Sequence, residues 1–137
     1  MTNKLTEFVF ERIGVPSYNK YLNLASFRHK LVSGNVANAA TPEFRRRDID
    51  FQGEFAKATG QSERLKGVLT DEKHIPLGSH PDSAPDVKKT PVPEGDLNSV
   101  DIDQEVATLS KNELLYSIGA RLLQRKFDGV RNAITSK

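Results

Sequence analysis

An apolar repeat in the C-terminal segment most strongly constrains how this chain can fold. Alternate steps of four and three residues from Ile102 to Ile134 meet apolar side chains at nine of ten positions. Such a repeat predicts a long helix that packs along a partner helix. At 1.5 Å per residue, a helix from Asp101 to about Thr135 would be roughly 50 Å long. The seam consists of Ile102, Val106, Leu109, Glu113, Tyr116, Ala120, Leu123, Phe127, Val130 and Ile134.

The start of this helix carries the residues expected at a helix N-terminus. Asp101 can serve as the N-cap, with Gln104 three residues on. Asp103 and Glu105 would then lie at the positive end of the helix dipole. The sequence therefore predicts that the helix begins immediately after Asp101.

The partner helix is predicted in the N-terminal segment, over about 18–40. Tyr18, Leu22, Ala25, His29, Val32, Val36 and Ala39 repeat the same spacing, and Leu24 and Leu31 broaden the stripe. The helix should stop near Ala40, because Pro42 disfavours a helical conformation of the residue before it. A short amphipathic helix at about 3–13, closed off by Gly14 and Pro16, should precede it.

The middle of the chain is predicted to be irregular or extended. Five of the seven prolines fall between residues 61 and 99. The expected fold is mainly α: two long terminal helices form a coiled-coil or helical hairpin, and some β structure is allowed for between them. We divide the chain into 1–42 (N-terminal helices), 43–99 (middle segment) and 100–137 (C-terminal helix).

Composition favours a chain that completes its core by assembly. Its 137 residues and 15.2 kDa amount to one domain, and 36% of the residues are hydrophobic. Two helices joined by some 60 residues of weak periodicity would bury only one seam. We therefore expect neighbouring copies, or related chains, to cover the remaining apolar surface.

The sequence offers no recognised catalytic or metal-binding pattern. Cysteine is absent, and His29, His74 and His80 have no partner at a ligand spacing. The pairs Asp48/Asp50 and Asp101/Asp103 suit helix capping and local ion pairs better than a magnesium site. We expect no cofactor, no metal and no enzymatic activity. No cleavable signal is visible, and no apolar run reaches the roughly 18 residues of a membrane span.

Two interpretations apply to the basic run Arg45, Arg46 and Arg47. After Phe44 it could grip phosphates while the ring stacks on a base, as in a helical nucleic-acid-binding module. Yet carboxylates bracket the run, and the net charge is only +2. We favour ion pairs between subunits and expect no nucleic-acid partner.

Two asparagines at the end of the N-terminal helix also allow two interpretations. Asn35 and Asn38 are three residues apart and share one helix face. Buried between helices, they could fix register as a polar group does in a coiled-coil seam. Alternatively, Asn38 only helps to end the helix and Asn35 is solvated.

The residues around these asparagines also carry a resemblance. Asn35-Val36-Ala37-Asn38-Ala39-x-Thr41-Pro42-x-Phe44-Arg45 resembles the N-terminal signature of the flagellar rod, hook and hook-associated family. Arg47-Asp48-Ile49-Asp50-Phe51, His74-Ile75-Pro76 and Val100-Asp101-Ile102-Asp103-x-Glu105, with Asn112 and Tyr116, resemble the short proximal-rod branch of that family. Glu43 stands where the family usually has Gly, so we expect no positive φ and no type II turn after Pro42.

The resemblance implies a structural subunit of the proximal rod of the bacterial flagellar basal body, or a different rod subunit. A secreted coiled-coil filament unrelated to flagella stays open as an alternative. Implied partners are further copies of the chain, other rod subunits, the rod-base adaptor, and the membrane-ring and export-gate proteins. The implied location is the periplasmic rod, reached through the flagellar type III apparatus without a cleaved signal.

From both arguments we select residues for the assembly interface. Those from the signature are Leu31, Asn35, Val36, Asn38, Thr41, Pro42 and Phe44. Those from the C-terminal seam are Ile102, Val106, Leu109, Tyr116, Leu123 and Phe127. Candidates for charge pairing between subunits are Arg45, Arg46, Arg47, Asp101, Asp103 and Glu105.

Overall fold

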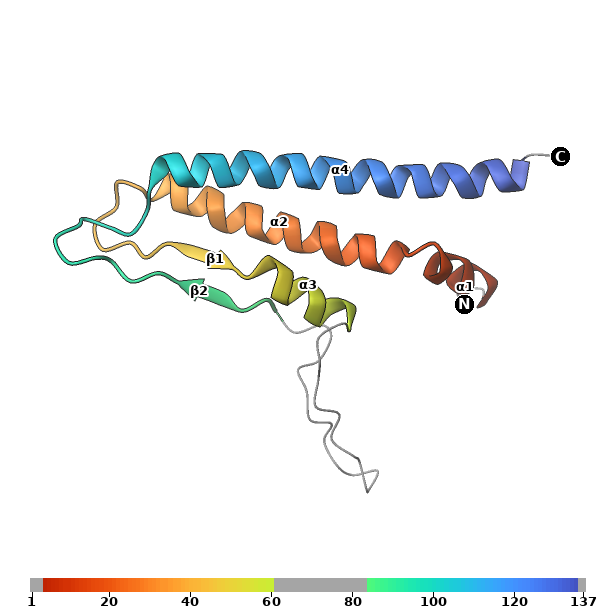
Figure 1. Ribbon diagram of the computed structural model, residues 1–137, viewed down its shortest axis with the longest axis horizontal. Coiled ribbons are helices and arrows are strands. Elements are labelled where there is room, and N and C mark those ends of the chain that lie inside the picture. Colours follow the sequence, from red (N-terminus) through yellow and green to blue (C-terminus); the bar gives the residue numbers. More distant parts are fainter. Residues whose placement is uncertain (1–3, 61–83, 136–137) are drawn as a thin grey trace, which may run out of the picture.

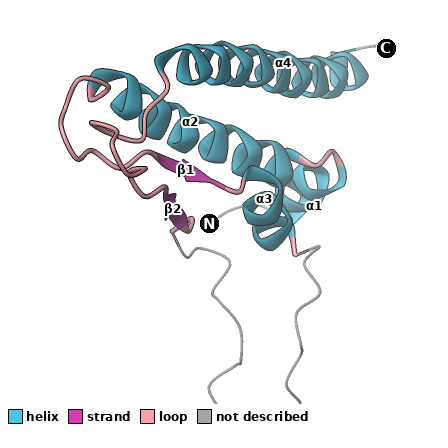
Figure 2. Ribbon diagram, turned by 60° about the vertical axis from the view of Figure 1, so that its left-hand side comes forward, coloured by secondary structure: helices cyan, strands magenta, loops and turns pink. Residues whose placement is uncertain are grey.

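Two long antiparallel helices form the body of the molecule. The computed structural model describes residues 4–60 and 84–135. In chain order the elements are α1 (Lys4–Arg12), α2 (Val15–Ala37), β1 (Arg47–Ile49), α3 (Phe51–Thr59), β2 (Val87–Lys89) and α4 (Ile102–Thr135). Helix α2 lies between α4 on one side and β1, β2 and α3 on the other (Figure 1 and Figure 2). This confirms the expected mainly α fold built on a helical hairpin.

The boundaries of α2 differ by a few residues from the predicted 18–40. The helix begins at Val15, because Pro16 lies in its first turn, where proline is tolerated, and does not separate two helices. Gly14, with φ of 78°, makes the turn from α1 instead. The helix ends at Ala37, and the chain turns before it reaches Pro42.

Helix α4 begins where the sequence predicted. The backbone N–H of Gln104 donates to Asp101 Oδ1 at 3.2 Å, so Asp101 caps the helix. The helix then runs without a break from Ile102 to Thr135.

The middle segment contains more structure than predicted. Strands β1 and β2 pair antiparallel, with Ile49 opposite Val87, and α3 follows β1 directly. This helix has ordinary signals: Asp50 Oδ1 accepts from the N–H of Gly53 at 3.2 Å, and Gly60 ends the helix with φ of 75°. The expected irregular stretch over 61–83, with His74-Ile75-Pro76, lies outside the described residues.

Helix α4 meets α2 through a face that only partly overlaps the predicted seam. Its buried residues are Glu105, Asn112 and Gly119, which are seven apart. A heptad repeat is therefore present, but polar and small residues occupy its centre. The seam residues Ile102, Val106, Tyr116, Phe127 and Ile134 are exposed. The prediction that this seam packs on the partner helix is wrong for them.

Close approach of the helices explains the shifted register. A Cβ atom at Gly119 would lie 3.0 Å from Tyr21 Cε1 and 3.3 Å from Leu22 Cδ2. Asn112 Nδ2 donates to the carbonyl oxygen of Ala25 at 2.9 Å. A helix face with a glycine and a bonded amide can approach more closely than one with large apolar side chains. The fully buried apolar core is correspondingly small: Val15, Leu24, Ala25, Val32 and Ile49.

Candidate assembly surfaces

Asn35 joins three segments of the chain at the closed end of the hairpin. It is fully buried, with 0% of its surface exposed. Its Nδ2 donates to the carbonyl oxygen of Arg47 at 2.7 Å and to Glu105 Oε2 at 2.8 Å, and its Oδ1 accepts from the N–H of Arg47 at 2.9 Å. One amide thus ties α2 to β1 and α4. The interpretation that Asn35 is solvated is wrong, and its buried position fits a register-fixing role.

Glu105 completes this buried network from α4. Its carboxylate is fully buried and accepts from Asn35 and from Arg46 Nε, the latter at 2.5 Å. Burying a carboxylate is costly unless it is paired and hydrogen bonded, and both conditions hold here. The expected pairing of Arg46 and Glu105 between subunits is therefore wrong, because they pair with each other inside one chain.

Asp48 extends the network from β1 to Arg28 on α2. Arg28 donates to it bidentately, with Nε–Oδ1 and Nη2–Oδ2 distances of 2.8 Å, and Arg46 Nη2 lies 3.2 Å from Oδ2. Burial alone would raise the pKa of Asp48, but the hydrogen bonds from Arg28 and from the N–H of Ile49, with the two guanidinium charges, hold that pKa below its usual value. The hydrogen bonds that Arg28 donates to Asp48 in turn raise the pKa of Arg28.

Asn38 serves a local purpose. Its Nδ2 donates to the carbonyl oxygen of Gly34 at 2.8 Å, and its Oδ1 accepts from Thr41 Oγ1 at 3.3 Å. Both partners belong to the end of α2 and the turn after it. The structure thus bears out the interpretation that Asn38 helps to end the helix.

The turn after Pro42 corrects a prediction. Glu43 has a φ of 58°, and the N–H of Phe44 donates to the carbonyl oxygen of Thr41 at 3.4 Å. Proline at the second position and a positive φ at the third are the features of a type II turn, which we did not expect without glycine. The N–H of Glu43 donates to the carbonyl oxygen of Leu97 at 2.7 Å, and this bond helps to hold the strained residue in place.

Sequence reasoning missed two residues that hold this end together. Asn98 Nδ2 donates to the carbonyl oxygen of Ala39. Ser99 Oγ accepts from the N–H of Arg46 at 2.8 Å. Both lie in the segment before α4 and bind it to the turn after α2. Only their position just before the Asp101 cap marked them in the sequence, and that signal is weak.

The remaining signature residues lie around this network. Thr41, Pro42, Arg45 and Arg47 are exposed, and Leu31, Val36 and Phe44 are half-buried. The guanidinium of Arg47 lies over the ring of Phe44, 5.6 Å from its centroid. Asp101 and Asp103 are exposed at the start of α4. Of the three arginine side chains, that of Arg46 is bonded in the network, whereas Arg47 takes part through its backbone.

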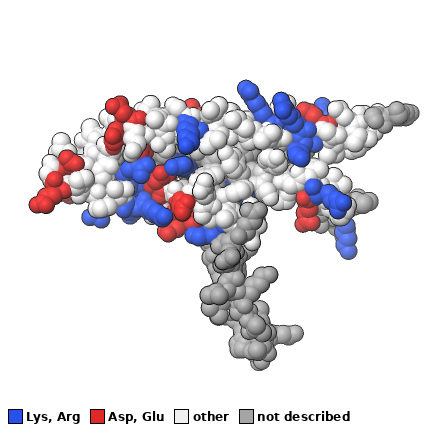
Figure 3. All heavy atoms as spheres, in the orientation of Figure 1, with Lys and Arg blue, Asp and Glu red and all other residues white. Residues whose placement is uncertain are grey.

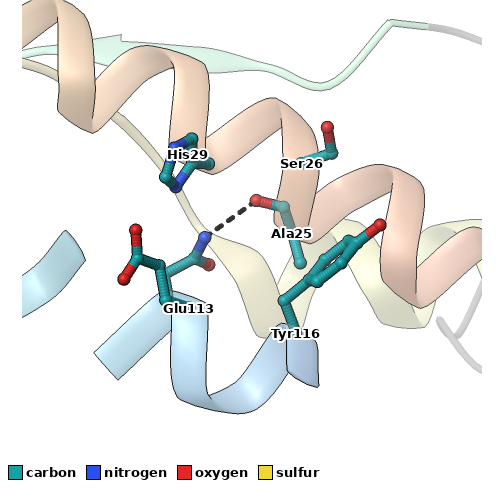
Figure 4. A pocket seen from close by; sticks show the side chains of 6 residues that line it. Ala25, Ser26, His29, Glu113 and Tyr116 are labelled. Atoms are coloured by element: carbon teal, nitrogen blue, oxygen red, sulfur yellow. Dashed lines mark hydrogen bonds between the residues drawn. The ribbon is translucent and has the colours of Figure 1, made fainter. Parts of the chain in front are cut away.

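Two residues of the predicted seam, Glu113 and Tyr116, line a hollow between α2 and α4. Elsewhere along the seam Leu109 and Leu123 are half-buried, and Ile102, Val106 and Phe127 are exposed. At mid-length the hollow has a volume of about 230 Å³. Figure 4 shows Ser26 and His29 from α2 facing Glu113 and Tyr116 from α4. The lining residues are Ala25, Ser26, His29, Asn112, Glu113 and Tyr116.

A second apolar surface lies on α4, and the sequence analysis did not identify it. We call Leu114, Leu115, Ile118 and Leu122 the outer stripe; these residues are 39–60% exposed. Leu114, Ile118 and Leu122 follow one another at steps of four, and Leu115 lies three residues before Ile118, so all four lie along one side of the helix. The sequence analysis took the seam repeat to be the whole apolar face of the helix. The stripe lies at other positions and was therefore missed.

Comparison with known proteins places this arrangement in a family. Flagellar basal body rod protein FlgB of Cereibacter sphaeroides is 34% identical over 127 residues, which cover 90% of this chain and 94% of the relative. The chain belongs to the FlgB family of flagellar basal body rod proteins. FlgB of Salmonella typhimurium is 33% identical over 119 residues (82% and 86%), and that of Escherichia coli K12 is 32% identical over 121 (84% and 88%). No family model matches the chain.

Within 4–60 and 84–135, no three His, Asp or Glu side chains come together in a way that could hold a metal ion. No helix in these two ranges is both long and apolar enough to cross a membrane.

Proposed function

We propose that the chain is a non-enzymatic structural subunit of the proximal rod of the bacterial flagellar basal body. The similarity to FlgB over more than four-fifths of the chain carries this proposal. The subunit polymerises helically with further copies and with other rod subunits. It forms part of the drive shaft between the membrane ring with its export gate and the distal rod, and it contacts the rod-base adaptor.

The apolar surface of α4 supports a role in assembly. Nine large apolar side chains of this helix are exposed, from Ile102 to Ile134. Large apolar side chains exposed in such number on one helix mark an interaction site. We therefore propose the selected signature and seam residues as assembly contacts, except Asn35, Arg46 and Glu105, which act through the fold of the single chain. We also propose that the chain is organised as N-terminal helices (1–42), a middle segment (43–99) and a C-terminal helix (100–137).

The proposed route and location follow the family. The chain leaves the cytoplasm through the flagellar type III apparatus without cleavage and assembles in the periplasm. The absence of cysteine in the whole sequence is compatible with passage into an oxidising space.

A pair of matched variants tests assembly through the seam. Tyr116→Asp places a charge beside the hollow, whereas Ser110→Asp places the same charge on another exposed face of α4. In a strain lacking the native gene, we expect Tyr116→Asp to abolish motility and rod formation and Ser110→Asp to keep both. Circular dichroism of both purified chains should show the same helix content. Normal motility of the deletion strain would overturn the proposal.

A different rod subunit of the same family is the alternative within this class. Mass spectrometry of isolated basal bodies, with the position of the chain mapped by antibody labelling, separates proximal from distal placement. For the nucleic-acid alternative, Arg46 is already engaged by Glu105 and Asp48. Binding to a labelled duplex that falls steeply with added salt would revive that alternative.

A further inference from the structure

The outer stripe and the hollow lie on different sides of α4. Ile118, at the centre of the stripe, is two residues from Tyr116, which lines the hollow. At 100° per residue, two residues correspond to 200° around the helix, so the two side chains leave it in nearly opposite directions. Each copy therefore carries an apolar ridge on one side and an apolar hollow on the other.

The two surfaces also differ in charge. Lys111, Arg121 and Arg125 lie within one turn of stripe residues on α4. The charged residue among those lining the hollow is Glu113, and His29 faces it from α2. Figure 3 shows basic side chains gathered over the second half of α4. Ridge and hollow are thus complementary in charge as well as in shape.

We infer that the outer stripe of one copy docks into the hollow between α2 and α4 of the next copy. This inference rests on the proposed function and names the partner of the assembly surface: a second copy of this chain. A ridge of leucine and isoleucine side chains entering a hollow of about 230 Å³ buries the exposed apolar surface of both copies. The cations beside the ridge then approach Glu113 of the next copy.

The contact is heterologous, because two different surfaces meet. A heterologous contact generates a ring when the rotation closes and an open helical filament when it does not. A self-matching contact of stripe on stripe would instead give closed pairs and would bring Lys111, Arg121 and Arg125 of two copies together.

Crosslinking in assembled basal bodies tests the contact. The chain has no native cysteine, so introduced pairs report without background. We would express the double variant Ser26→Cys/Ile118→Cys alongside the native chain, isolate basal bodies, and add a short bis-maleimide. The expected product is a series of crosslinked dimers and larger oligomers that neither single variant gives. The pair His29→Cys/Leu122→Cys samples the same contact at a second position.

The control pair is Ser26→Cys/Glu94→Cys. Glu94 is exposed in the loop before α4, away from the stripe, and should give no oligomers. If the chain is found in basal bodies but neither test pair crosslinks, the inference is wrong and the proposed function stands. Dimers from Ile118→Cys alone would show a symmetric contact and also overturn it. Absence of the chain from the basal bodies would instead reject the proposed function.

Discussion

The two ends of the helical hairpin are stabilised in different ways. At the start of α4, Glu105 is fully buried and bonded to Asn35 and Arg46, so polar contacts hold three segments together. Beyond Gly119, α4 buries no further residue completely, and Ile134 is 78% exposed. The contacts within the single chain therefore stabilise mainly the end at Glu105. At the other end apolar surface of α4 remains exposed.

The largest effect should come from breaking the buried network. Glu105→Ala removes the acceptor of both Asn35 Nδ2 and Arg46 Nε. We expect the free energy of unfolding to fall by about 3 kcal/mol, since removing one partner of a buried pair leaves the other uncompensated. Urea denaturation followed by circular dichroism measures this. The exposed Glu113→Ala should change it by less than about 0.5 kcal/mol, and equal midpoints for both variants would contradict the comparison.

A smaller loss in the free energy of unfolding is expected at the contact between α2 and α4. In Gly119→Ala the new methyl group would lie about as close to Tyr21 as packing allows, and Tyr21 is held edge-on against Phe51 and Phe55. Overpacking of this kind costs about 1–3 kcal/mol. Gly129→Ala meets no atom within 4 Å and should stabilise the helix by about 0.5–1 kcal/mol. Thermal melting of both variants would reveal the opposite signs, and a shift in the same direction would argue against the helix contact.

Acid should weaken the network end selectively. The pKa of Asp48 is lowered in the folded chain, so its contribution to stability is complete above the unfolded pKa of about 3.9 and is lost as the pH falls through the folded value. We expect Asp48→Asn to be less stable than the native chain at pH 7. Below pH 4, the free energy of unfolding of the variant should fall less than that of the native chain. Urea midpoints at several pH values measure the two slopes. Parallel slopes would show that Asp48 is not the group responsible.

The smallest effect should come from the exposed apolar side chains of α4. Ile134→Ser and Leu114→Ser alter side chains that are largely exposed in the single chain. Their free energies of unfolding should stay within about 0.5 kcal/mol of the native value. A loss above 1 kcal/mol in urea denaturation would show that this surface is already covered in the isolated chain.

The elements at the ends of the chain were predictable because their signals are local. The Asp101 cap, the apolar periodicity and the turn residue Gly14 lie within the segments they define. Helix α3 was also signalled, by Asp50, the Phe51/Phe55 spacing and Gly60, but the density of prolines farther along the middle segment outweighed these residues.

The site could be predicted only in part. The importance of Asn35 followed from its pattern, but its partners Arg47 and Glu105 are separated from it by 12 and 70 residues, and spacing alone does not pair such positions. The seam of α4 was found as an apolar repeat, yet periodicity does not say which neighbour covers it. In this chain Glu105, Asn112 and Gly119 set the register in which α4 packs on α2.

The polar centre of the helical hairpin has a thermodynamic consequence. Because α4 buries Glu105, Asn112 and Gly119 against α2, separating the two helices transfers little hydrocarbon to water. Exposure of apolar surface raises the heat capacity and exposure of polar surface lowers it, while the denaturant slope follows the total area exposed. Calorimetry of the isolated chain should therefore give a heat-capacity increment below the usual 12–15 cal/mol/K per residue, with an accordingly shallow dependence on urea.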